Sequence, residues 1–323
     1  NALRHRGLVS AGEYLGRLQD CRDAAYWQTW ARRALLVLAA VHVLAGVVFF
    51  FAYNWDALSP FSKFGILQSG MVLSFLAALV LGLQKPAGQA MLIAASVLTG
   101  VLFAVIGQVY QTGADAWELF VAWSVLTLPW VLSSRSAAHW LFWLLLFLTA
   151  AALYGSQVLL PLGYVNEMQL STEIGLLPLP FLAAREVGLR SGFDWLDGSW
   201  LRRSLVVLSS VPLFWVAVAY VFSTDDALVG FVAFVLVSAA LGYLYLKVLP
   251  DFSVLAIQVA LASLLLMAIG GRLIFEFLEA SNAGSLTFGL FLLGAWCVFL
   301  MSAVVRLLRT LHARLQAGGA HVQ

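Results

Sequence analysis

The stretch STEIGLLPLPFLAA, Ser171 to Ala184, decides how many times this chain crosses a membrane. It is apolar, but it is short for a membrane-crossing helix and is interrupted by Pro178 and Pro180. If it crosses, every later helix keeps one orientation; if it does not, every later helix is inverted. The rest of the sequence therefore has to settle the question.

The composition indicates that the solvent of this protein is a lipid bilayer. Hydrophobic residues make up 62% of the 323 residues and charged residues 11%. Soluble domains carry about 45–50% apolar and about 25% charged residues. We therefore expect an all-α fold, a polytopic membrane helix bundle. The net charge of +2 gives no reason to expect a nucleic-acid partner.

The apolar segments give the number of spans, because about twenty apolar residues cross a bilayer. The ten candidates are residues 34–54, 64–83, 90–110, 117–133, 138–160, 168–184, 203–222, 227–247, 252–272 and 285–306. The sixth of these contains the stretch quoted above.

Basic residues indicate whether the sixth segment crosses, because cytoplasmic loops carry an excess of Lys and Arg. With ten spans, sixteen of the eighteen basic residues lie on one side, and only Lys63 and Arg272 lie on the other. Without the sixth crossing the split is nine against nine. The sequence therefore predicts about ten transmembrane helices with both termini in the cytoplasm.

This topology divides the chain into four parts. They are a cytoplasmic amphipathic helix within residues 1–33, a five-span half at 34–160, a second five-span half at 161–306, and a basic cytoplasmic tail at 307–323. The first part has apolar residues at helical spacing, so it can lie on the membrane or dock a membrane-protein partner through residues 1–30. Residues 185–203 mix Trp with Arg, which fits either an interfacial helix or a plain connector.

Three motifs in the first half resemble a known family. They are GLVSAGEYLGRL at 7–18, FAYNWDALSPFSKFG at 51–65, and GQVYQTGADAWELFVAWSVLTLPW at 107–130. Together they resemble the bacterial membrane family called domain of unknown function 2157, over about residues 8–150. This resemblance implies a bacterial inner-membrane location. It brings no established activity, so it assigns no catalytic residue.

Polar residues gather at the predicted outer ends of the helices, where charged groups by default face the bundle interior or a water-filled cavity. We expect an outward-facing polar vestibule whose ligand-binding residues are Asp56, Gln108, Tyr110, Gln111, Asp115, Glu118, Arg272 and Glu276.

Spacing suggests how these residues are used. Gln108 and Gln111 are three apart and would share one helix face. Arg272 would either pair with a carboxylate or hold an anionic ligand. Alternatively, Asp115 caps the fourth helix and Glu118 completes a capping box.

The remaining patterns limit the function classes. No protease, hydrolase, P-loop or dinucleotide motif is present. Two distant cysteines and five scattered histidines give no metal spacing, so we expect no catalytic set, metal or cofactor. The mid-span Gln68 and Gln258 should hydrogen-bond between helices. We expect a transporter-like or ligand-binding bundle whose partners are membrane lipids and a small solute or lipid-like ligand. The alternatives are a structural or regulatory membrane subunit and a membrane enzyme acting on a lipid-linked substrate.

Overall fold

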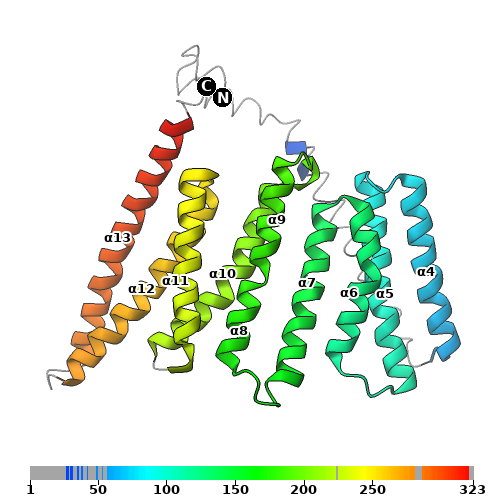
Figure 1. Ribbon diagram of the computed structural model, residues 1–323, viewed down its shortest axis with the longest axis horizontal. Coiled ribbons are helices and arrows are strands. Elements are labelled where there is room, and N and C mark those ends of the chain that lie inside the picture. The colour runs from blue at the N-terminus through cyan, green and yellow to red at the C-terminus, as the bar shows by residue number, and fades with distance from the viewer. Residues whose placement is uncertain are drawn as a thin grey trace, which may run out of the picture. The chain divides into compact units, whose positions relative to one another are not determined.

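The structure is a computed structural model that describes residues 57–222, 225–280 and 286–319, together with residues 27, 28, 30, 31, 35, 38, 42, 49 and 53. Its regular elements are all helices, and no strand occurs in this described part of the chain (Figure 1). The expected all-α class is therefore confirmed. The chain divides into two compact units, residues 1–66 with 320–323, and residues 67–319.

Eight helices are long and apolar enough to cross a membrane. They are α4 (Pro60–Leu81), α5 (Pro86–Tyr110), α6 (Ala116–Ser134), α7 (Ala137–Tyr154) with its π-helical extension η1 (Gly155–Leu159), α10 (Ser199–Val221), α11 (Leu228–Tyr243) with η4 (Leu244–Val248), α12 (Phe252–Ala280) and α13 (Leu286–Gly319). A single turn of 3-10 helix, η3 (Asp225–Ala227), precedes α11. Each of the eight coincides with one of the expected spans to within a few residues, and α13 continues through most of the segment expected as a tail. The first expected span, 34–54, falls mostly outside the described residues.

The sixth expected span is a broken helix. It consists of α8 (Glu167–Leu176) and α9 (Pro178–Arg190), which meet at Leu177. Pro178 occupies the first turn of α9, where its missing N–H costs nothing. The start of α8 is a capping box, in which Gln169 N–H donates to Asn166 Oδ1 at 2.8 Å and Asn166 N–H donates to Gln169 Oε1 at 3.0 Å. The connector after α9 contains the 3-10 turn η2 (Asp194–Leu196).

Small residues allow close contact between the helices of residues 67–319, as is typical in membranes. Gly175 of α8 lies so close to α10 that a Cβ atom would come within 2.8 Å of Leu213 Cγ. In the α5–α6 pair, the indole of Trp123 lies over Gly100 and donates from Nε1 to the carbonyl of Ser96 at 2.7 Å. Close contacts between a side chain of one helix and the backbone of the next fix the relative position of neighbouring helices.

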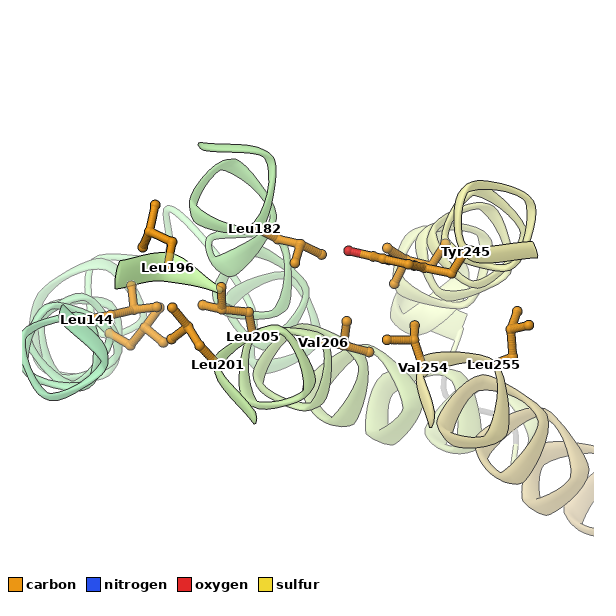
Figure 2. Close-up of a cluster of buried hydrophobic side chains, with 11 residues drawn as sticks. Leu144, Leu182, Leu196, Leu201, Leu205, Val206, Tyr245, Val254 and Leu255 are labelled. Atoms are coloured by element: carbon orange, nitrogen blue, oxygen red, sulfur yellow. The ribbon is translucent and has the colours of Figure 1, made fainter. Parts of the chain in front are cut away.

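A buried apolar cluster joins α7, α9, α10, η4 and the start of α12 (Figure 2). Its buried members include Leu144, Leu201 and Leu205, together with Val206, Tyr245 and Val254. The ring of Tyr245 is completely buried. This cluster is the scaffold for the charged groups described below.

Basic residues concentrate at one end of residues 67–319, and seven of the acidic residues lie at the other, because successive spans run in opposite directions (Figure 1). The basic end, where α5, α7, α10 and α12 begin, carries Lys85, Arg135, Arg185, Arg190, Arg202, Arg203, Lys247, Arg306, Arg309 and Arg314. The acidic end, where these helices finish, carries Asp115, Glu118, Glu167, Asp225, Asp226, Glu276 and Glu279. Arg272 is the one basic residue at the acidic end among described residues 67–319.

Candidate functional site

Five of the candidate ligand-binding residues lie in or beside the turn between α5 and α6, at the acidic end. Gln108 and Tyr110 lie in the last turn of α5. Gln111 is the C-cap residue and adopts a left-handed conformation with φ of 47°. The expectation that Gln108 and Gln111 share a helix face is therefore wrong, because the helix ends before Gln111.

Asp115 lies at the N-cap position of α6, as its spacing to Glu118 suggested, but its side chain makes no capping hydrogen bond. The expected capping box at this helix is therefore wrong. The N–H of Trp117 instead donates to Gln157 Oε1 of η1 at 3.3 Å. The indole of Trp117 packs edge-on against Tyr154 of α7, with ring centroids 5.1 Å apart.

Arg272 is paired with a carboxylate, which was one of its two expected roles. Its Nε donates to Glu276 Oε1 at 2.5 Å, one helical turn along α12, and its Nη1 donates to the carbonyl of Val221 at the end of α10. These contacts use two of the five N–H donors of the guanidinium. The Arg272 side chain is 33% exposed and that of Glu276 is 51% exposed.

Two cavities meet at this ion pair, since Arg272 and Glu276 line both. One, of about 400 Å³, lies between α10, α11 and α12 and includes Asp225 in its wall. The other, of about 580 Å³, lies between α12 and α13 and includes Glu279. The rest of both linings is mainly apolar. Each cavity has the size of a small-molecule site.

The structure does not bring all the candidate residues together. The α5–α6 pair packs on α7, whereas α12 packs on α10, α11 and α13. In Figure 1, α5 and α12 lie on opposite sides of α7 and α10. The cavities at Arg272 are therefore lined without Gln108, Tyr110, Gln111, Asp115 or Glu118. Asp56 lies outside the described residues.

One of the two mid-span glutamines joins helices as expected. Gln258 of α12 is buried and donates from Nε2 to Ser210 Oγ of α10 at 2.9 Å. Gln68 is exposed on α4 and makes no such bond within the described residues. The expectation is thus confirmed for Gln258 alone.

A buried charged network at the basic end was not expected from the sequence. It joins Arg185 and Glu186 of α9, Arg202 of α10, Tyr245 of η4 and Asp251 before α12. Arg202 Nε donates to Glu186 Oε1 at 2.8 Å, and Arg202 Nη1 donates to Asp251 Oδ2 at 2.7 Å. Arg185 Nη1 and the Tyr245 hydroxyl also donate to Glu186 Oε1, at 2.6 and 3.1 Å. Two arginines and two carboxylates thus neutralise one another.

Asp251 also begins α12. Its Oδ1 accepts hydrogen bonds from the N–H groups of Ser253 at 2.9 Å and Val254 at 3.3 Å, as an N-cap residue does. Burial raises the pKa of Asp251, but the Arg202 guanidinium and these two N–H groups lower it by more. The pKa of Asp251 therefore lies below that of an ordinary aspartate, and the group is ionised at neutral pH.

Two weak local signals for this network exist in the sequence. Arg185 and Glu186 are adjacent, and Asp251 stands two residues before Ser253 in a helix-capping arrangement. Neither signal specifies a partner, because Arg202 and Tyr245 reach Glu186 only through packing between helices. Within the described residues, no group of three His, Cys, Asp or Glu side chains could hold a metal ion.

Comparisons with known proteins concern the first part of the chain. Neither the curated proteins nor the solved structures contain a match. A family model does match, and it starts and ends close to the limits expected from the three motifs. Residues 1–140 match the family described as "Predicted membrane protein (DUF2157)", which confirms the resemblance of this part of the chain to that family.

Proposed function

We propose that the protein is a ten-span bundle of the bacterial inner membrane with both termini in the cytoplasm. Eight helices of suitable length support this topology. The sixth crossing would be the broken pair α8–α9, and the first would be formed by residues 34–54. The concentration of Lys and Arg at one end of residues 67–319 supports a cytoplasmic location for the basic end.

We further propose that the bundle binds a small amphipathic solute at its acidic end, in a transporter-like role. The observation that carries this proposal is the Arg272–Glu276 pair, which lines two cavities at once. An accessible charge pair between mainly apolar walls suits a ligand with a charged group and an apolar body.

The local charge favours a cationic ligand. Glu276 neutralises Arg272, which leaves Asp225 in one cavity wall and Glu279 in the other. Both of these carboxylates are exposed. A lipophilic organic cation would place its charge beside Asp225 and its apolar groups against Tyr220 and Phe231.

Saturable binding of tetraphenylphosphonium to the detergent-solubilised protein tests this function. Asp225→Asn should weaken binding about fivefold, because removal of one accessible ion pair costs roughly 1 kcal/mol. Asp226→Asn is the matched control, since Asp226 is adjacent and lines neither cavity. Equal affinities of the two variants, or no saturable binding, would exclude the proposed cation site.

The remaining interaction proposal concerns residues 1–30, most of which lie outside the described part of the chain. We propose this segment as the docking site for a membrane-protein partner. Deletion of residues 1–30 should release a partner that copurifies with the full chain in mild detergent. Retention of that partner after the deletion would exclude the segment as the docking site.

A further inference from the structure

A further cavity lies at the basic end, remote from the two Arg272 cavities. Its volume is about 240 Å³, and it is lined by residues of α7, α9, η2 and the start of α10. Leu144, Leu196, Leu201 and Leu205 line it and converge from α7, η2 and α10 in Figure 2. Phe181 and two tryptophans, Trp140 and Trp195, complete most of the wall. Nearly all of the surface inside this cavity is therefore apolar.

Arg185 is the one charged side chain in this wall. Its side chain is 2% exposed, and two of its nitrogens are occupied: Nη1 by Glu186 and Nη2 by the Gly198 carbonyl at 3.2 Å. Its buried Nε has no hydrogen-bond partner. A buried donor without an acceptor destabilises the structure, and more so when the group is charged. Arg185, a residue of the cavity wall, thus carries a buried N–H donor that still lacks an acceptor.

The lining side chains cannot supply that acceptor. The polar side chains in the wall are Arg185, Trp140 and Trp195, and guanidinium and indole groups donate hydrogen bonds without accepting them. A single water would find few partners here, because ordered waters usually need two to four polar groups. An occupant with an apolar body and an acceptor oxygen satisfies both features of the cavity.

The position of the cavity indicates where such an occupant comes from. Trp140 lies in the first turn of α7, and its ring stacks on that of Trp195 at a centroid distance of 6.3 Å. Tryptophan at the end of a membrane helix marks the level of the lipid headgroups. At that level the ester oxygens of phospholipids lie beside their acyl chains. We propose that the cavity binds one acyl chain of a bilayer phospholipid, with an ester carbonyl oxygen accepting the Nε–H of Arg185.

Photo-crosslinking with a phospholipid that carries a diazirine on one acyl chain tests this proposal. The full chain is reconstituted into nanodiscs containing the probe, irradiated and mapped by peptide mass spectrometry. Adducts should concentrate on the cavity-lining parts of α7, α9 and α10. Labelling spread evenly over the lipid-facing helices would overturn the proposal.

Two neighbouring alanines provide a matched pair of variants. Ala184 lines the cavity, whereas Ala183 is also exposed on α9 and does not line it. Ala184→Trp should fill the cavity and lower its labelling by at least about fivefold, and Ala183→Trp should leave labelling unchanged. Ala184→Phe serves as a smaller filler if the tryptophan variant does not fold. Equal labelling of filled and control variants would overturn the proposal.

The role of Arg185 is tested separately. Arg185→Lys keeps the positive charge but removes the Nε–H, so labelling should fall about tenfold, the value of a charged hydrogen bond. Arg203→Lys, at an arginine outside the cavity wall, is the control. A diazirine fatty acid is the second probe. Stronger labelling of the cavity by the free fatty acid than by the phospholipid would overturn the assignment to a bilayer lipid.

Discussion

The sharpest prediction concerns Glu186, which is the centre of the buried network at the basic end. Its carboxylate accepts four hydrogen bonds: one from Arg185, two from Arg202 and one from Tyr245. The side chains of Glu186 and Arg185 are 9% and 2% exposed. Replacement by alanine would therefore leave two guanidinium groups and one hydroxyl without their acceptor.

The magnitude follows from this geometry. Removal of one partner from a buried ion pair costs about 3–5 kcal/mol, because the other charge stays buried and unpaired. Arg202 is 17% exposed and keeps its bond to Asp251, so water and Asp251 compensate part of the loss. We therefore expect Glu186→Ala to lower the free energy of unfolding by about 3 kcal/mol. Glu186→Gln keeps an acceptor oxygen and should cost about half as much.

Unfolding of the detergent-solubilised protein by a titration with SDS, followed by circular dichroism, measures this difference. Glu173→Ala is the matched control, since Glu173 is exposed on the neighbouring helix α8. Surface substitutions of this type change stability by less than about 0.5 kcal/mol. If Glu186→Ala and Glu173→Ala gave the same free energy of unfolding, the network would not hold these helices together, and the reasoning would be refuted.

Three further predictions concern charge and topology. The folded-state pKa of Asp251 is lowered, so the stabilising effect of its carboxylate is present above the unfolded pKa of about 3.9 and is lost as the pH falls through the folded pKa. The difference in thermal stability between wild type and Asp251→Asn should therefore shrink as the pH falls from about 5 to about 3. A difference that stays constant over this range would contradict the prediction. Arg272→Met removes a partly exposed positive charge from the cavity that also contains Asp225, so it should raise the affinity for tetraphenylphosphonium; lower affinity would show that Arg272 itself contacts the ligand. A cysteine at Gly163 should react with a membrane-impermeant maleimide added outside intact cells and one at Ser191 should not; the opposite pattern would overturn the proposed orientation.

The elements that the sequence predicted well are those with local causes. Eight apolar runs became eight long helices, and Pro178 marked the break between α8 and α9. Arg272 was likewise expected to pair with a carboxylate, and it pairs with Glu276, four residues along the same helix. Each of these outcomes depends on residues within one helix or one apolar run.

The features that the sequence did not predict depend on where a helix ends or on which helices meet. Gln111 does not lie on the expected helix face because α5 ends at Tyr110. Gly113, which adopts a positive φ, was the residue in the sequence that indicated a turn there. Arg202 and Asp251 are 49 residues apart, and only the packing of α10 beside α12 brings them together. The charge count placed Arg185 and Arg202 at the same end of the bundle as most other basic residues, and the structure agrees. It did not predict that the two side chains are largely buried.

The two ends of the second unit use charge in different ways, and α10 connects them. At its start, Arg202 belongs to a closed network in which every carboxylate is matched by a guanidinium. At its end, the carbonyl of Val221 accepts a hydrogen bond from Arg272, whose partner Glu276 is half exposed beside open cavities. Charges that are buried and matched hold helices in place, whereas accessible charges beside a cavity remain free to attract a ligand. Substitutions at the start of α10 should therefore act mainly on stability, and those near its end mainly on binding.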